Sequence, residues 1–228
     1  MTSESKKCLI VRGGWEGHTP VESTEHFAAL LKQAGVEVEI AESTERYLKG
    51  DLAEFALILQ CVTMSEIQKE EWAALSAAVR GGVGFAGWHG GIIDSFRQNT
   101  DYQFMVGGQW VAHPGNIIPT HQVTITDADH PITRGLADFD LPETEQYYIH
   151  YDPGVTVLCE TVFSGKHGDG SLYPAGVCMP YAWTRSYGEG RIFVACWGHT
   201  FKDFQVKTAS TLVLRGLCWA AGMDDLPE

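Results

Sequence analysis

Basic residues are scarce in this sequence, which holds 16 Lys and Arg against 29 Asp and Glu among 228 residues, for a net charge of -13. A surface of that sign repels the phosphates of nucleic acids and of anionic membranes, and no Lys/Arg-rich run offsets it. No apolar stretch reaches the roughly 18 residues that a membrane-spanning helix needs. The composition therefore predicts neither a nucleic-acid partner nor a membrane partner.

Paired cysteines and a leader segment are also missing. The six cysteines form no CxxC pair and mostly lie in apolar runs, which predicts buried free thiols in a reducing compartment rather than a disulfide framework or a zinc–cysteine site. The N-terminal residues MTSESKK are polar and lead directly into a strand-like run. Without a secretory signal, we expect a cytoplasmic protein.

The first 90 residues alternate apolar runs with amphipathic segments. Alternation of this kind predicts a parallel sheet with helices on both faces. Thr19 is placed to cap the first helix and Ser65 the second, and the alternating run 36–40 suits a sheet edge. The expected elements are strands at 7–12, 36–40, 55–60 and 83–87, with helices at 20–34 and 65–80.

The second half is less regular. We expect strands near 121–126, 155–162, 177–184 and 191–196, and a final helix at 203–221. The segments 99–120 and 163–175 are rich in Gly, Pro and aromatic residues, which is typical of ordered loops that carry function. No linker interrupts the chain, so residues 1–228 are predicted to form one domain.

The stretch GFAGWHGG, residues 84–91, places His89 directly after the fourth strand. Ligands of open parallel sheets bind beyond the carboxyl ends of the strands. A sharp strand-to-helix turn there is the geometry of a nucleophile elbow, which needs small neighbours such as Gly87, Gly90 and Gly91 because the backbone is crowded. The next helix would offer backbone N–H groups to a carbonyl or an anion.

Four further residues are candidates for the same edge. His18 follows the first strand and His199 the last one, although His18 could simply hydrogen-bond at a helix entry. Glu145 lies in an aromatic stretch, where a carboxylate is costly unless it is paired and where its pKa shifts toward acid–base use; the alternative is an exposed glutamate. His113, in a Gly-rich loop, could be a ligand, a base or a brace.

Several segments resemble the ThuA-like (trehalose utilisation) family of the class I glutamine amidotransferase-like superfamily. The matching segments are GGWEGH (13–18), GWHGG (87–91), VGGQWVAHPG (106–115), HPITRGL (130–136), ETEQYY (143–148) and YAWTRSYGEGRIFVACWGHT (181–200). Amidotransferases of the superfamily carry cysteine at the elbow and His-Pro-Glu after a late strand. This chain has His89 at the elbow and Thr200-Phe201 after His199, so we expect no glutaminase activity. The family usually has Asp-Glu before a tyrosine, where this chain has Thr144 and Glu145.

The resemblance implies a flavodoxin-like α/β fold, an open parallel sheet with helices on both faces, and a role in trehalose-like disaccharide catabolism beside an oxidoreductase that forms 3-keto sugars. We expect a lyase or hydrolase that acts on a 3-keto-glycoside, with His18, His89, Glu145 and His199 as the catalytic acid–base groups. Hydrolysis or isomerisation without elimination stays open. The alternative class is a non-catalytic sugar-binding or accessory subunit of the oxidoreductase.

We expect aromatic side chains and the glycines that follow His89 to bind the substrate. The candidate substrate-binding residues are Trp15, Trp88, Gly90, Gly91, Trp110, His113 and Tyr147, although the aromatic residues, with Trp183, are equally well explained as core. A divalent metal, zinc first, could bind His18, His113 and Glu145. No nucleotide cofactor is expected, and a homo-oligomer stays open. We expect His89→Ala and Glu145→Gln to affect turnover far more than stability.

Overall fold

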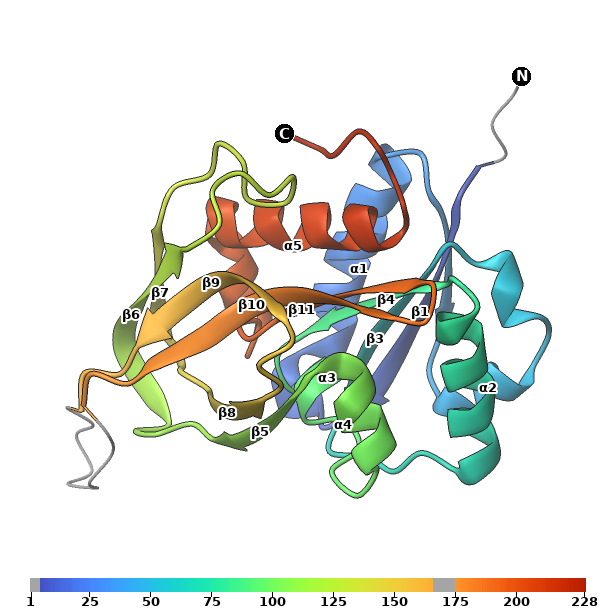
Figure 1. Ribbon diagram of the computed structural model, residues 1–228, viewed down its shortest axis with the longest axis horizontal. Coiled ribbons are helices and arrows are strands. Elements are labelled where there is room, and N and C mark those ends of the chain that lie inside the picture. The colour runs from blue at the N-terminus through green and yellow to red at the C-terminus, as the bar shows by residue number, and fades with distance from the viewer. Residues whose placement is uncertain (1–4, 166–174) are drawn as a thin grey trace.

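The computed structural model describes residues 5–165 and 175–228. A nine-stranded sheet runs through the molecule in the order β2-β1-β3-β4-β11-β10-β9-β6-β7, beside a two-stranded sheet of β5 and β8 (Figure 1). The strands are β1 (Lys7–Gly14), β2 (Glu37–Ala41), β3 (Leu57–Thr63), β4 (Gly84–Trp88), β5 (Gly108–Ala112), β6 (Ile117–Ile125), β7 (Phe139–Glu145), β8 (Tyr148–Tyr151), β9 (Thr156–Val162), β10 (Cys178–Tyr187) and β11 (Gly190–Ala195).

The helices lie on both faces of this sheet. They are α1 (Pro20–Gln33), α2 (Lys69–Arg80), α3 (Gly90–Ile93), α4 (Thr100–Val106) and α5 (Lys207–Ala220), with short 3-10 turns η1 (Glu16–His18), η2 (Thr44–Leu48), η3 (Leu52–Glu54) and η4 (Phe201–Gln205). In Figure 1, α1 and α5 lie on one side of the strands and α2 and α4 on the other. Among the described residues, no helix is long and apolar enough to cross a membrane.

The strands β2, β1, β3, β4 and β11 form the parallel half of the sheet, and this confirms the predicted α/β class. β2 lies at the edge, as its alternating pattern predicts. Every residue of β3 is buried, because a central parallel strand is covered on both faces. The carboxyl ends of these strands meet at one edge of the sheet, and that edge carries the site described below.

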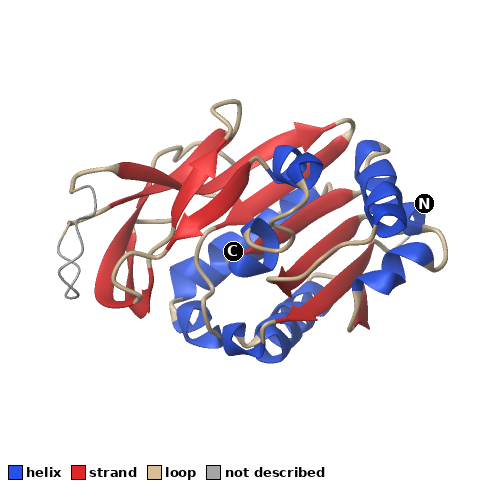
Figure 2. Ribbon diagram, turned by 90° about the horizontal axis from the view of Figure 1, so that it is seen from below, coloured by secondary structure: helices blue, strands red, loops and turns tan. Residues whose placement is uncertain are grey.

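The other half of the sheet is antiparallel, from β11 through β10, β9 and β6 to β7. It extends away from the N-terminus, past the helical layers (Figure 2). β7 and β8 are absent from the sequence-based expectation. The segment 99–120 is no mere loop, because it holds α4, β5 and the start of β6. The segment 163–175 lies mostly outside the described residues.

Three predicted helix ends are wrong in detail. α2 begins at Lys69 and not at Ser65, because Gln68 and Glu71 form the capping box one turn later. Thr19 precedes α1 with φ +45° and makes no side-chain cap. The expected helix 203–221 is divided at Val206 into η4 and α5. As expected, the cysteines are free, and all except the exposed Cys178 are buried.

Candidate functional site

Four residues that are far apart in the sequence converge at the carboxyl edge of the sheet. His18 ends η1 after β1, His89 follows β4 and His199 follows β11. Glu145 is the last residue of β7 and comes from the antiparallel half. Their candidate ligand atoms all lie within 4.8 Å of one another. We refer to His18, His89, Glu145 and His199 as the inner cluster.

His89 has the backbone of a nucleophile elbow. Its φ of 49° and ψ of -143° are rare for a residue with a side chain, and such strain gathers at functional sites. Its backbone N–H donates to the carbonyl of Ala195 at 2.7 Å, which anchors the turn to β11. The positive φ of this turn falls on His89 itself and not on Gly87, Gly90 or Gly91.

The glycines near His89 allow other parts of the chain to pack closely against the turn. A Cβ on Gly87 would lie 2.4 Å from the carbonyl oxygen of Gln60, and one on Gly90 would lie 2.7 Å from the His18 ring. A Cβ on Gly91 would meet the backbone of Cys61 at 2.9 Å. Contacts that short do not occur for real side chains, so these positions admit only glycine without a shift. Gly90 in particular lets the His18 ring reach His89.

Glu145 faces the histidines with both carboxylate oxygens. Oε2 lies 3.3 Å from Nε2 of His89 and 3.2 Å from Nδ1 of His199. Oε1 lies 3.7 Å from Nε2 of His113, which sits on the outer side of the cluster. Glu145 is only 7% exposed, so the alternative of a surface glutamate is wrong.

Three inner atoms are buried without a hydrogen bond. Nε2 of His89, Nδ1 of His199 and Oε2 of Glu145 approach one another, but they are not aligned as hydrogen bonds. A buried polar atom that lacks a partner costs about 1–3 kcal/mol. Three such atoms that point at one another indicate a shared partner, which for imidazole nitrogens and a carboxylate is a proton donor, a substrate or a metal ion.

The opposite ring nitrogens are held from behind. Nδ1 of His18 lies 3.1 Å from the Thr63 hydroxyl, and Nδ1 of His89 lies 3.0 Å from the Tyr147 hydroxyl. The Tyr147 ring also stacks on His89, with centroids 3.8 Å apart. Partners of this kind fix the orientation of a histidine ring and the tautomer it takes.

Burial sets the charges in the cluster. Desolvation, with the nearby imidazoles, lowers the pKa of His89 to about 4 and that of His18 further still. For Glu145, burial alone would raise the pKa, but the facing His199 and His89 outweigh it and hold this pKa well below its usual value. At neutral pH His18 and His89 are therefore neutral, and the carboxylate of Glu145 is ionised.

The inner cluster fits the ligand set of a divalent metal. Zinc binds neutral imidazole and carboxylate, and ligands at roughly 2.1 Å from one ion lie at most about 4.2 Å apart, so only a small contraction is needed. Of the expected set of His18, His113 and Glu145, two residues, His18 and Glu145, belong to this group. His113 lies outside the group, and His89 and His199 take its place, because both adjoin Oε2 of Glu145.

Trp15, Trp110 and His113 lie on the outer side of the cluster. Trp15 is 48% exposed and its ring meets His18 edge-on at 4.8 Å. Trp110 lies 5.6 Å from the ring of His113 and 6.2 Å from that of Tyr147. The guanidinium of Arg97, which sequence reasoning missed, covers Trp110 at 4.6 Å.

Two other aromatic residues, Trp88 and Trp183, follow the alternative of a core role that the sequence left open. Trp88 is 1% exposed and packs against Phe27 and Phe204, so it belongs to the core and offers no face to a sugar. Trp183 is buried as well and donates to the carbonyl of Val106. Tyr147 does adjoin the cluster, but as a buried support for His89.

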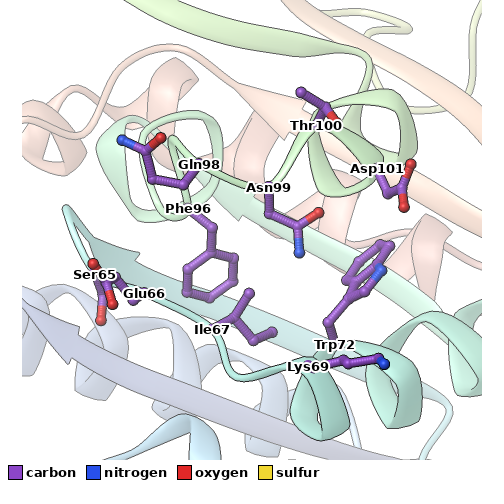
Figure 3. A pocket seen from close by; sticks show the side chains of 10 residues that line it. All are labelled: Ser65, Glu66, Ile67, Lys69, Trp72, Phe96, Gln98, Asn99, Thr100 and Asp101. Atoms are coloured by element: carbon purple, nitrogen blue, oxygen red, sulfur yellow. The ribbon is translucent and has the colours of Figure 1, made fainter.

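An open cavity of about 500 Å³ lies elsewhere, between the start of α2 and the segment before α4 (Figure 3). It contains none of the inner cluster, and its walls include Trp72, Phe96 and Asn99. The inner cluster is more enclosed, since Glu145 and His199 have side chains only 9% and 13% exposed. The chemistry therefore does not coincide with this cavity.

Comparisons with known proteins agree with the fold. The ThuA family model, described as trehalose utilisation, matches residues 7–220. A ThuA-like protein from Bacteroides uniformis ATCC 8492 is 22% identical, with a TM-score of 0.73 and 94% of each chain covered. One from Parabacteroides merdae ATCC 43184 is 16% identical, with a TM-score of 0.78, covering 99% of this chain and 94% of that one.

A third similar structure is the β-galactosidase from Bacillus circulans sp. alkalophilus. It is 14% identical, with a TM-score of 0.60, and the match covers 97% of this chain and 32% of the galactosidase chain. At these identities all three structures show a shared fold alone. The sequence comparison with curated proteins gives no match.

Proposed function

The chain belongs to the ThuA family, and we propose that it is an enzyme of sugar utilisation that cleaves a 3-keto-glycoside at the inner cluster. The family description, trehalose utilisation, supports a role in sugar utilisation. The single observation that carries the catalytic proposal is the convergence on Glu145 of three imidazoles, the buried His18 and His89 and the 13% exposed His199. A module that only binds sugar needs rings and amides, and it gains nothing from burying ionisable groups with unpartnered atoms.

The proposed reaction uses the acidity that a ketone gives to the neighbouring carbon. A carbonyl at C3 acidifies the proton on C2. Removal of that proton with expulsion of the C1 substituent breaks the C2–H and C1–O bonds and forms a double bond between C1 and C2. The C2 proton passes to a base on the protein, and the departing oxygen takes a proton from an acid or from water.

The residues divide these roles by position. His113 is 30% exposed in its side chain, and its Nε2 lies 3.7 Å from Glu145, so it is the group best placed to take a proton from a bound sugar and share it with the carboxylate. His18 and His89 are neutral at working pH, and together with His199 they hold the reacting end of the sugar. Trp15, with its exposed ring, supplies a face for a sugar ring to stack on.

A divalent metal, zinc first, fits the inner cluster. Three of its four members would suffice for a catalytic site, which keeps one position open. When bound, the ion would act as a Lewis acid that polarises a carbonyl oxygen. Thr63 and Tyr147 then serve as the outer partners that keep His18 and His89 oriented.

Elemental analysis tests the metal part of the proposal. Protein purified without added metal and without a histidine tag should carry close to one zinc, manganese or related ion per chain, and Glu145→Gln should lose it. His130→Gln is the control, because the His130 ring packs beside Trp219 at 5.6 Å, away from the cluster. Less than about a tenth of an equivalent, with cleavage that resists chelators, would end the metal part and leave the acid–base part.

A further inference from the structure

One buried carboxylate oxygen ties together two segments of the site. Oδ2 of Asp203, in η4, accepts hydrogen bonds from the backbone N–H groups of Gly198 at 2.9 Å and His199 at 3.0 Å. The same oxygen accepts the Thr144 hydroxyl at 2.9 Å. Thr144 directly precedes Glu145, so Asp203 touches the neighbours of two inner-cluster residues from behind.

The rest of η4 reaches the other segments. The backbone N–H of Phe201 donates to the Thr19 hydroxyl at 2.8 Å, next to His18. On the outer surface, Lys202 pairs with Glu143. One short turn thus contacts the segments that carry His18, Glu145 and His199, and Asp203 is its buried charged residue, at 1% exposure.

A space-filling role does not explain Asp203. Burying a carboxylate is costly unless it is hydrogen-bonded, and Oδ1 of Asp203 is buried without a hydrogen bond. An apolar residue of similar size would avoid that cost. The carboxylate fixes the positions of the turn at Gly198 and of the end of β7. The φ of Gly198 is 104°, a value that favours glycine.

We propose that Asp203 is a positioning residue that sets the 3.2 Å approach of His199 Nδ1 to Glu145 Oε2. It touches neither ring nor substrate and acts through the backbone of His199 and through Thr144. The catalytic consequence rests on the proposed function, whereas the geometric claim does not. Loss of Asp203 lets the His199 turn and the end of β7 move independently.

The variants Asp203→Ala, Asp203→Asn and Thr144→Val test this. Asp203→Ala removes all three hydrogen bonds, whereas Asp203→Asn keeps one oxygen that can accept them, and Thr144→Val removes only the link to β7. Ring-nitrogen NMR of the metal-free protein reports the surroundings of each histidine. In Asp203→Ala the signals of His199 should shift while those of His130, beside Trp219, stay, and the effect should decrease from Asp203→Ala to Asp203→Asn.

Zinc affinity and kinetics give the second readout. Zn²⁺ affinity should fall about 10- to 100-fold in Asp203→Ala, and kcat on a keto-glycoside should fall by more than KM rises. Thr144→Val should show a smaller loss of the same kind. If Asp203→Ala does not fold, Asp203→Asn and Thr144→Val decide the question.

A protein that melts at a lower temperature but keeps the His199 signals, the Zn²⁺ affinity and kcat would overturn the proposal, because Asp203 would then be structural only. If the parent protein neither binds Zn²⁺ nor cleaves a keto-glycoside, the proposed function fails. The NMR comparison still supports or refutes the role of Asp203 in that case.

Discussion

The Tyr147 hydroxyl lies 3.0 Å from Nδ1 of His89, and the two rings stack with their planes 25° apart. This contact determines which nitrogen of His89 is available, because Nε2 is left to face Glu145. Burial raises the pKa of Tyr147 well above its usual value, so the hydroxyl keeps its proton. Tyr147 therefore orients His89 from behind, which differs from the substrate contact that the sequence suggests.

Tyr147→Phe should leave the stacking in place and remove only this hydrogen bond. We expect a stability loss of about 1–3 kcal/mol from the unpartnered Nδ1. Cleavage and metal affinity should each fall about 10- to 100-fold, as for other outer partners of ligand histidines. Urea unfolding and Zn²⁺ titration measure the two effects. Activity and affinity equal to those of the parent would show that Tyr147 is only packing.

His89→Ala should cost more stability than its position on a turn suggests. The sequence alone predicts a small void, but the structure has His89 at 1% exposure, stacked on Tyr147. We now expect a loss above about 1 kcal/mol from the cavity and the unpartnered Tyr147 hydroxyl. His89→Gly is the matched variant, since glycine relieves the positive φ. Thermal unfolding of both variants checks this, and a melting temperature equal to the parent's in His89→Ala would contradict it.

Stability should fall in acid. Burial lowers the pKa values of His89 and His121 to about 4, against roughly 6.5 in an unfolded chain. Between those pH values the unfolded state binds more protons than the folded state. The contribution of these histidines to the free energy of unfolding is therefore fully present above pH 6.5 and decreases as the pH falls toward 4. The depressed pKa of Glu145 acts in the same direction at lower pH.

Urea unfolding at pH 7.5, 6 and 5, with chelator present, measures this loss. Each such histidine contributes a slope of up to about 1.4 kcal/mol per pH unit. His121→Gln removes one contribution outside the cluster, so its stability should fall less steeply than that of the parent. An unfolding free energy that is constant from pH 7.5 to 5 would rule out buried neutral histidines.

The protein should release no ammonia from glutamine. His89 occupies the elbow position where an amidotransferase has cysteine, and an imidazole cannot replace the thiolate in a stable acyl intermediate. The carboxylate that faces His199 is Glu145, from a different strand. A coupled ammonia assay measures this, and release above the blank that disappears in His89→Ala would refute the expectation.

The sequence predicts the parallel half of the fold and names all four residues of the inner cluster as candidates. Apolar runs followed by His18, His89 and His199 are local signals, and parallel topology alone brings the ends of such strands together. Glu145 depends on antiparallel strands whose pairing is not local, so its aromatic neighbours indicate a site but not its partners. The sequence predicts Asp203 as the first residue of a helix, because nothing in FKDFQ shows that its carboxylate accepts hydrogen bonds from the turn before it.

The metal set shows the same limit. His113 lies in a Gly-rich segment and His89 adjoins Gly90, and sequence spacing does not tell which of the two rings lies beside His199 at Oε2 of Glu145. The sequence also does not show the close approach at Gly90, where a side chain would collide with the His18 ring. Trp88 is the converse case, since its place beside His89 suggests a site whereas strand alternation turns its ring into the core.

Cleavage of 3-keto-trehalose by the parent and by Glu145→Gln is the most direct test of the account. Glu145→Gln keeps the shape of the side chain and removes its charge, so the variant should melt within a few degrees of the parent. Release of glucose should be evident for the parent, with zinc, manganese or magnesium supplied, and should fall by a factor of about 10² to 10⁴ in the variant. Equal release by both proteins, or a parent that binds the sugar and never cleaves it with any of these metals, would contradict the account and favour a sugar-binding subunit.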